Sequence, residues 1–214
     1  MFRRLGSVVV GCTLLLLPVT SAYGEPYVGL HLGVSIPFET DLDRTNPTLN
    51  LRNLSVDDSL TFGVKAGLWL TEIPYLGGEI EMYHFAPEIP PQPAGGGTLA
   101  DRIDLEITTF GFNFMARTFL APDQTMPRGR GQVYVGVGPT LVIAEAETLG
   151  GDDKDTAVGV QVLFGLRFFL TPDVAIFTEY KFSHTPFVFT IGGTRDEFDI
   201  NASHLVFGVS LHFR

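Results

Sequence analysis

Residues 59–71, Ser-Leu-Thr-Phe-Gly-Val-Lys-Ala-Gly-Leu-Trp-Leu-Thr, hold the pattern that decides the fold. Every even-numbered position from Leu60 to Leu70 is apolar, whereas the odd-numbered positions carry mostly small or polar residues and include Lys65. Because successive side chains of a β-strand point to opposite faces, this alternation predicts a strand with one apolar and one polar face. The predicted strand is far longer than the usual globular strand of about 5 or 6 residues.

The same alternation recurs along the chain, and helical periodicity is absent. A tilted strand needs about 9 to 11 residues to cross the hydrocarbon of a membrane. Short connections, such as Glu72–Tyr75 and Thr171–Asp173, follow long ones, such as Glu39–Asp58. This order predicts an eight-stranded antiparallel up-and-down transmembrane β-barrel with both termini in the periplasm. The predicted strands are Pro26–Phe38, Ser59–Thr71, Leu76–Ala86, Asp101–Leu120, Gln132–Glu145, Asp155–Leu170, Val174–Phe187 and Asp199–Phe213.

The remaining connections are predicted as loops or turns at the two ends of the barrel. They are Pro87–Ala100, Ala121–Gly131, Ala146–Lys154 and Val188–Phe198.

Composition excludes several other classes of protein. The chain has 214 residues, a single Cys and a formal net charge of −10. Its aliphatic and aromatic content excludes disorder, and the single Cys excludes a disulfide scaffold. The acidic balance makes nucleic acid an unsuitable partner.

Residues 1–24 are predicted to be a cleaved secretory signal peptide, which leaves residues 25–214 as the barrel domain. Arg3 and Arg4 precede an apolar core, and cleavage is expected after Gly24. Cys12 follows Val9-Val10-Gly11 in the manner of a lipoprotein site, but the leucine run comes after it. We therefore expect Cys12 to be an inert part of the signal. The longest apolar run after residue 24, Val133 to Ala144, is shorter than the 20 or so residues of a membrane helix.

The polar faces of several predicted strands carry charged residues near their middle. In a soluble barrel this face would be the solvated outside. However, the face is rich in glycine, which suits the crowded interior of a narrow barrel, so we predict lipid outside and charges inside. The expected inward-facing, ion-paired set is Lys65, Glu79, Glu81, Arg117, Arg167, Glu179 and Lys181.

Register gives this set specific partners. Pairing of Leu70 with Leu76 places Lys65 opposite Glu81, and the next short turn places Arg167 diagonal to Glu179. The sequence therefore predicts a lumen plugged by ion pairs.

The strand Asp101–Leu120 changes phase. Ile103, Leu105 and Ile107 occupy odd positions, whereas the phenylalanines from Phe110 to Phe114 occupy even ones. Either a bulge near Thr108-Thr109 restores the lipid-facing side, or the first part of the strand projects above the bilayer. The sequence leaves both possibilities open.

The C-terminal residues resemble the assembly signal of Gram-negative outer-membrane barrels. The alternating residues of this signal are Leu205, Phe207, Val209, Leu211 and Phe213. The segments Tyr27–Gly33 and Phe177–Phe182 are similar to the first and seventh strands of small OmpA-like barrels. The resemblance implies an outer-membrane location, recognition by the barrel-assembly machinery and contact with outer-membrane lipid and lipopolysaccharide. We expect a monomer without a cofactor, and without the peptidoglycan-binding domain of OmpA.

Catalytic and metal-binding patterns are weak. Ser183-His184-Thr185 and Ser203-His204 are the nearest matches to the His and Ser of lipid A deacylases, but they lack that family's spacing, so strand-end polar residues are favoured. His31, His84 and His212 have no metal-ligand spacing. The run Asp152-Asp153-Lys154-Asp155 lacks the order of a calcium loop. The acidic residues of the predicted loops are interpreted as solvated charges, or as a weak divalent-ion bridge to lipopolysaccharide.

Three functions remain after this survey. The sequence favours a structural or surface-interaction role without enzymatic activity. The first alternative is a narrow channel for small or hydrophobic solutes, as in OmpW-like barrels. The second is a lipid A-modifying barrel enzyme.

Overall fold

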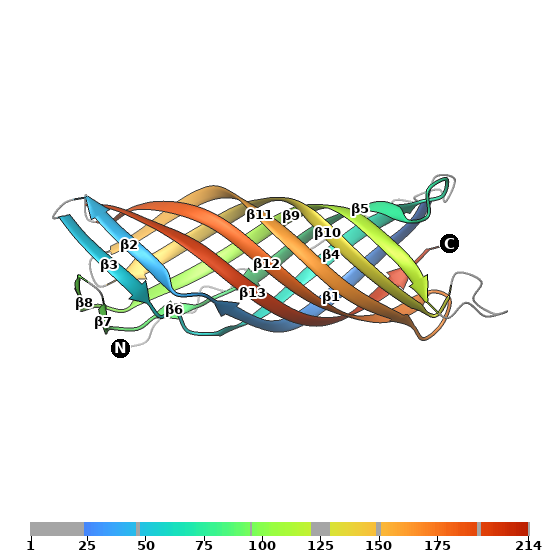
Figure 1. Cartoon of the computed structure of the whole chain (residues 1–214), viewed down its shortest axis with the longest axis horizontal. Coiled ribbons are helices and arrows are strands. Elements are labelled where there is room, and N and C mark those ends of the chain that lie inside the picture. Colours follow the sequence, from blue (N-terminus) through green and yellow to red (C-terminus); the bar gives the residue numbers. More distant parts are fainter. Residues whose placement is uncertain are drawn as a thin grey trace, which may run out of the picture.

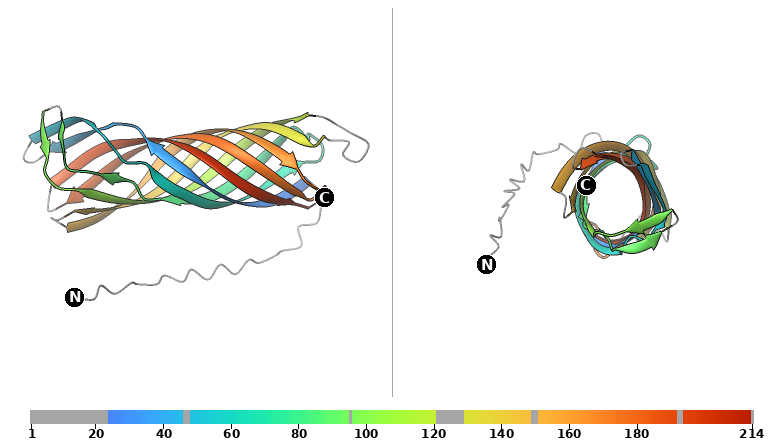
Figure 2. Two further views of the ribbon diagram at one scale, coloured as in Figure 1. Left: turned by 90° about the horizontal axis from the view of Figure 1, so that it is seen from below. Right: turned by 90° about the vertical axis from the view of Figure 1, so that its left-hand side faces the viewer.

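The computed structural model of the chain describes residues 24–45, 48–94, 96–120, 129–148, 151–191 and 194–213. These residues form a closed cylinder of tilted strands (Figure 1), and the end-on view in Figure 2 shows the ring. The predicted signal peptide, with Cys12, lies outside the described residues except for Gly24, which begins the first strand. The described residues include no helix that is long and apolar enough to cross a membrane.

Eight strands build the wall, so the predicted eight-stranded antiparallel barrel is confirmed. Each of these eight wall strands pairs antiparallel with the next wall strand along the chain, and β1 pairs with β13 to close the ring. These strands are β1 (Gly24–Pro37), β4 (Ser59–Leu70), β5 (Leu76–Phe85), β9 (Ile103–Leu120), β10 (Gly131–Thr148), β11 (Gly151–Phe169), β12 (Val174–Ile191) and β13 (Thr194–His212).

Short strands gather at one end of the barrel, which we call the hairpin end (Figure 1). There β2 (Thr40–Thr45) pairs with both β13 and β3 (Thr48–Leu54), and β6 (Glu88–Ile89) pairs with β9. A separate hairpin joins β7 (Gln92–Ala94) to β8 (Gly97–Leu99). The opposite end, where β1 begins and β13 finishes, is called the terminal end.

Two of the predicted loops are wrong, because the wall strands continue through them. The pairing of β10 with β11 runs to Thr148 and Gly151, and that of β12 with β13 runs to Ile191 and Thr194. Ala146–Lys154 and Val188–Phe198 are therefore largely strand. The prediction depended on an apolar outer face, and outward residues such as Glu145 are polar here, although the backbone pairing is uninterrupted.

Of the two possibilities left open for the strand Asp101–Leu120, the structure excludes the bulge near Thr108-Thr109. One register joins β9 to β10 on both sides of this position, from Leu120 opposite Gly131 to Asp104 opposite Glu147. Ile103, Leu105 and Ile107 consequently face inward, where they are at most 6% exposed. The structure agrees with the other possibility, in which this part of β9 lies beyond the membrane.

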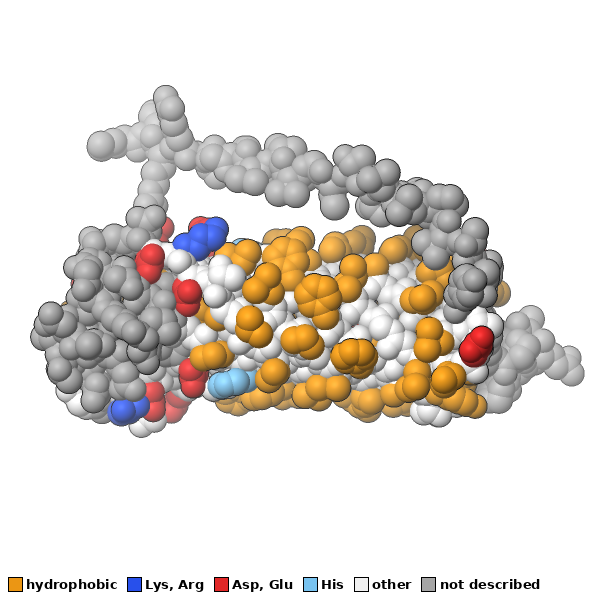
Figure 3. All heavy atoms as spheres, turned by 90° about the horizontal axis from the view of Figure 1, so that it is seen from above, with side chains coloured by type: hydrophobic (Ala, Val, Ile, Leu, Met, Phe, Trp, Pro, Cys, Tyr) orange, Lys and Arg blue, Asp and Glu red, His pale blue; other side chains and the backbone are white. Residues whose placement is uncertain are grey.

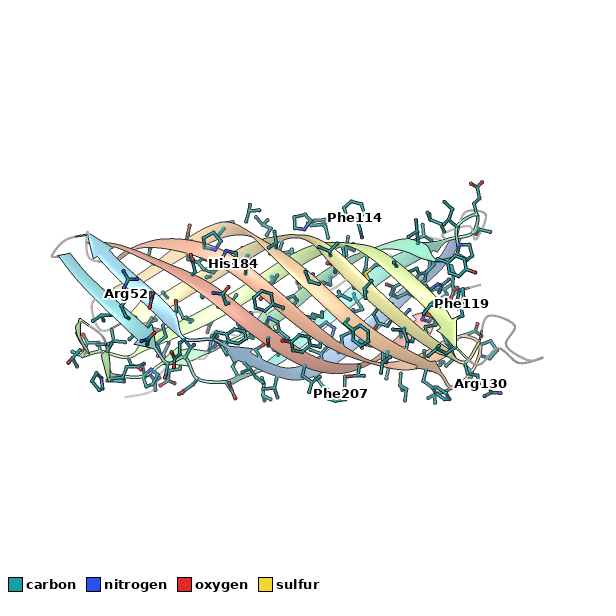
Figure 4. All side chains as sticks on the ribbon, viewed as in Figure 1. Arg52, Phe114, Phe119, Arg130, His184 and Phe207 are labelled. Carbon is teal, nitrogen blue, oxygen red and sulfur yellow. The ribbon has the colours of Figure 1, made fainter. Side chains whose placement is uncertain are left out.

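On the face shown in Figure 3, apolar side chains are spread along the wall, and we call the exposed apolar side chains of the wall the belt. Most charged side chains on this face lie toward the hairpin end, and an acidic one lies at the terminal end. Phe114 and Leu60 are 76% and 77% exposed, and Phe114 and Phe207 project away from the barrel in Figure 4. On β9 the outward face changes to Asp104 and the exposed Glu106 above the belt. The residues of the predicted assembly signal (Leu205, Phe207, Val209, Leu211 and Phe213) all belong to the belt.

Candidate functional site

The lumen holds all seven charged side chains that the sequence singled out. Their exposed fractions lie between 1% and 4%. The alternation of the strands causes this placement, because each of these residues has the odd-numbered parity that faces inward on its strand. The seven residues are Lys65, Glu79, Glu81, Arg117, Arg167, Glu179 and Lys181.

Lys65 is the centre of the network. Its ammonium Nζ lies 3.0 Å from Glu79 Oε1 and 2.6 Å from Glu179 Oε1. The Tyr27 hydroxyl donates a hydrogen bond of 2.6 Å to Glu79, and the Tyr134 hydroxyl donates one of 2.6 Å to Glu179. One cation thus bridges two carboxylates on opposite parts of the wall, and two tyrosines hold those carboxylates in place.

Glu81 belongs to a second group, next to the first. It pairs with Lys181 Nζ and accepts hydrogen bonds from Gln161 Nε2 at 2.6 Å and Asn113 Nδ2 at 3.1 Å. Lys65 and Glu81 are directly opposite in the ladder, as predicted, but they form no ion pair. That predicted pair is wrong, because the long Lys65 side chain reaches along and across the lumen to Glu79 and Glu179.

Arg117 forms a third group near the terminal end. Its Nη2 lies 3.1 Å from Glu25 Oε2, and Glu25 Oε1 lies 3.0 Å from His212 Nδ1. The Arg117 guanidinium also lies 4.3 Å from the Trp69 ring centroid and donates from Nε to the Pro74 carbonyl. Glu25 was not predicted because it is close to the expected cleavage site, outside the predicted first strand.

Arg167 differs from its predicted role. Register places it diagonal to Glu179, as expected, but no ion pair joins the two. Its guanidinium instead lies between the rings of Tyr27 and Tyr134, at 4.5 and 4.9 Å from their centroids. The predicted Arg167–Glu179 pair is wrong: Glu179 Oε1 bonds to Lys65 and Tyr134, and Glu179 Oε2 lies 3.5 Å from Lys181 Nζ.

Glycines allow both tyrosine rings to lie against the wall. Gly67 is the ladder partner of Tyr27, and Gly165 is the ladder partner of Tyr134. A Cβ atom at either glycine would overlap the facing ring. The glycine-rich inner face therefore has a specific purpose here, which is to make room for two aromatic rings that enclose Arg167.

The buried charges balance. Among the described residues with buried side chains, Lys65, Arg117, Arg167 and Lys181 face four glutamates, which are Glu25, Glu79, Glu81 and Glu179. Isolated charges in a low-dielectric interior are costly, whereas a balanced and hydrogen-bonded set is tolerated.

Histidines and serines lie beyond Glu81 toward the hairpin end. His204 is hydrogen-bonded through Nδ1 to Ser35 Oγ at 2.6 Å and through Nε2 to Ser183 Oγ at 3.1 Å. Neither of the two sequence runs forms a serine–histidine pair of its own, since His184 bonds to Asn201 and Ser203 bonds to Tyr180. These contacts fit the favoured interpretation of strand polar residues.

An apolar cluster fills the lumen at the hairpin end. Leu51 and Leu54 of β3 are 0% exposed and pack with Phe85, Ile103 and Phe187, among others. The turn before Leu54 is held by Asp41, whose carboxylate accepts the Asn53 amide N–H and the Arg52 guanidinium at 3.0 Å each. The hydrogen bond from the Asn53 amide, and to a smaller extent that from Arg52, holds the pKa of Asp41 below its ordinary value. Asn53 has a positive φ of 57°, which an asparagine tolerates well.

Acidic side chains remain on the surface of the hairpin end, and within the described residues no group of three or more could hold a metal ion. Glu145 pairs with Lys154. Arg102 pairs with Glu88 and Asp104 at 3.0 and 2.8 Å. The side chain of Asp152, part of the run compared with a calcium loop, lies outside the described residues.

Comparison with known proteins identifies relatives of the whole described barrel. Residues 8–213 match the family described as "Outer membrane protein beta-barrel domain". Neisserial surface protein A (NspA) shares 16% identity, with a TM-score of 0.55 over 89% of this chain and 99% of that one. Outer membrane protein OprG from Pseudomonas aeruginosa shares 12% identity, with a TM-score of 0.66 over 89% and 96%. At these identities the likeness shows the fold alone. No curated protein matches the chain.

Proposed function

Because this chain belongs to the outer membrane protein β-barrel domain family and lies in the Gram-negative outer membrane, we propose that it is a barrel with a closed lumen and a structural or surface-interaction role. In this proposal the apolar belt contacts outer-membrane lipid, and the hairpin end is extracellular, as long connections are in such barrels. The alternating residues Leu205 to Phe213 serve recognition by the assembly machinery, and the barrel acts as a monomer.

The observation that carries this proposal is that two different fillings occupy the lumen in series. Near the terminal end and the middle, four cations and four carboxylates are buried together. At the hairpin end, the apolar cluster with Leu51 and Leu54 follows. A hydrated ion must lose its shell to pass the apolar section and must displace ion pairs in the charged section, so both fillings oppose a steady ionic current.

The working surface in this proposal is the wall beyond the belt. Asp104 and Glu106 of β9 lie opposite Glu147 and Glu145 of β10, so carboxylates crowd one side of the extension. Directly opposed like charges weaken a strand pair. Arg102 pairs with Asp104 and Lys154 pairs with Glu145. The carboxylates of Glu106 and Glu147 therefore favour a role outside stability, such as contact with basic surface groups or, through divalent ions, with lipopolysaccharide.

Purified protein in planar lipid bilayers is expected to show no steady open channel, because both fillings must move before ions pass. Single-channel recording measures this directly. Brief, rare openings are compatible with the proposal. Sustained openings of defined conductance would contradict it and favour transport.

Transport of small or hydrophobic solutes is the second candidate, and one observation favours it. The inward residues of the hairpin-end lumen are apolar, which suits a hydrophobic solute better than an ion. This candidate requires Leu51 and Leu54 to leave the lumen, since both are fully buried in it. It therefore requires movement of β3, whereas the closed-lumen proposal requires none.

We also propose that the protein is not an enzyme. The serine–histidine contacts of His204 lie inside the barrel, where Ser35, Ser183 and His204 are at most 8% exposed, away from the lipid that a lipid A-modifying enzyme must bind. Lipid A from cells with and without the gene is expected to have the same acyl pattern by mass spectrometry. A change that Ser35→Ala or Ser183→Ala abolishes would overturn this part of the proposal.

A further inference from the structure

Arg167 is a buried cation whose hydrogen-bond donors meet no acceptor in the part of the chain that the structure describes. Its side chain is 2% exposed, and among the described residues none accepts a hydrogen bond from Nε, Nη1 or Nη2. A guanidinium carries five N–H donors in a rigid fork, and leaving them unmet in a buried position is costly. The rings of Tyr27 and Tyr134 stabilise the positive charge of the guanidinium in part. They lie over its faces, however, and accept none of the hydrogen bonds that its N–H groups direct along the guanidinium plane.

Gln132 has the same deficit beside it. It is the direct ladder partner of Arg167 across β10 and β11, it is 1% exposed, and neither Nε2 nor Oε1 has a partner among the described residues. Two adjacent inward side chains thus present unused donors to the same part of the lumen. Of the acceptors that the structure describes there, Gln132 Oε1 and Glu179 Oε2 also have no hydrogen-bond partner, but the unused N–H donors of Arg167 and Gln132 outnumber them, so the local deficit is one of acceptors.

Position limits the route to these groups. Gln132 is the second residue of β10, and Arg167 is two residues before the end of β11, so both lie near the terminal end. The Lys65 group and the hairpin-end apolar cluster close the lumen beyond them. Glu25, Trp69 and His212 are buried at the terminal end, so an acceptor that enters there, on the periplasmic side in the proposed orientation, has to pass these side chains.

We infer that Arg167 and Gln132 form a binding site for a small monovalent carboxylate at the periplasmic end of the lumen. The guanidinium fork matches the two oxygens of a carboxylate, and the Gln132 amide supplies a further donor. The Tyr27 and Tyr134 hydroxyls that flank Arg167 bond to the carboxylates of Glu79 and Glu179. These two negative charges repel a phosphate dianion more strongly than they repel a monovalent carboxylate. Binding at this end is independent of whether the lumen conducts.

The chain contains its own reporter for this site. Trp69 is the only tryptophan, and its ring stacks on Tyr27 at 6.2 Å between centroids, while Tyr27 in turn covers Arg167. Occupation of the fork is expected to shift the Tyr27 ring and thereby change Trp69 emission. No label is needed, and the reporter residue is outside the proposed set of ligand contacts.

The test is a fluorescence titration of the detergent-solubilised full barrel with sodium acetate, at constant ionic strength and neutral pH. We expect a saturable change in Trp69 emission and a weaker response to inorganic phosphate. Arg167→Met is expected to abolish the response, and Gln132→Leu, which keeps the cation, to raise the apparent dissociation constant about tenfold. Arg130→Met, which changes a cation at the same end (Figure 4), is the matched control and should respond as the unmodified protein does.

Three outcomes would overturn the inference. A linear or absent response in the unmodified barrel means that water alone satisfies Arg167. An unchanged response in Arg167→Met places the acetate elsewhere, and a response to phosphate that equals or exceeds that to acetate contradicts the assignment of a carboxylate. Arg167→Met is interpreted only if it passes the heat-modifiability test for a folded barrel. If it fails, the result for Gln132→Leu is used instead, and an unchanged affinity of that variant for acetate contradicts the site.

Discussion

Replacement of Lys65 by methionine is expected to lower the free energy of unfolding by about 3 to 5 kcal/mol, the usual cost of removing one partner from a buried ion pair. Lys65 Nζ is the bridge between Glu79 and Glu179, so its loss leaves two carboxylates with less compensation. Methionine preserves the length of the side chain and isolates the charge effect. Reversible urea unfolding in phospholipid bilayers, followed by Trp69 emission, measures the change.

A double-mutant cycle separates the observed partner from the one that register alone suggests. Glu179→Gln added to Lys65→Met should cost much less than it does in the unmodified barrel, because the two residues interact directly. Glu81→Gln should lower the free energy of unfolding of Lys65→Met by nearly as much as it does that of the unmodified barrel, since Glu81 bonds to Lys181. The opposite pattern would mean that Lys65 and Glu81 are the true pair. Arg102→Met, which breaks exposed ion pairs, is the control and should change stability by less than about 1 kcal/mol.

The fold could be predicted because the membrane imposes a clear pattern on the wall. Lipid requires an apolar residue at every second position, and β4 from Leu60 to Leu70 meets this requirement without exception. The pattern stops where the requirement stops. Beyond the belt, outward residues such as Glu106 and Glu145 face water, and inward residues such as Ile107 become apolar. The apolar and polar faces therefore exchange sides in that region while the strand continues. This exchange explains why the strand ends were missed and why a bulge remained one of two possibilities.

Seven of the charged residues in the lumen could be predicted, but their contacts could not. Parity alone places Lys65, Glu79 and Arg167 inside, and register alone gives their ladder neighbours. Contacts across a narrow lumen join strands that are distant in the ladder, such as β4 and β12 for Lys65 and Glu179. Ladder register carries no information on such pairs. The tyrosines were missed for another reason, since a tyrosine on a membrane strand is equally compatible with the lumen and with the lipid interface.

Gly165 is a position where a single added methyl group is expected to displace a whole aromatic ring. A Cβ atom there would overlap Cζ, Cε2 and Oη of Tyr134. The ring cannot stay in place, so the 2.6 Å hydrogen bond to Glu179 and the contact with Arg167 are lost together. Overpacking costs about 1 to 3 kcal/mol and a hydrogen bond to a charged group about 1.5 to 3 kcal/mol, so Gly165→Ala is expected to destabilise the barrel by about 2.5 to 6 kcal/mol.

The same unfolding measurement on Gly78→Ala provides the control for Gly165→Ala. Gly78 is also in a wall strand, but it faces outward, and the nearest atom to its added Cβ, apart from its own chain neighbours, is the Asn113 carbonyl oxygen at 3.9 Å. Alanine there meets ordinary contact distances, and it also removes some flexibility from the unfolded chain, so stability should stay equal or rise slightly. If both variants lose stability equally, the loss reflects strand backbone rather than the tyrosine. If only Gly165→Ala is destabilised, and Tyr134→Phe already removes part of the same energy, the glycine serves to seat the ring that encloses Arg167.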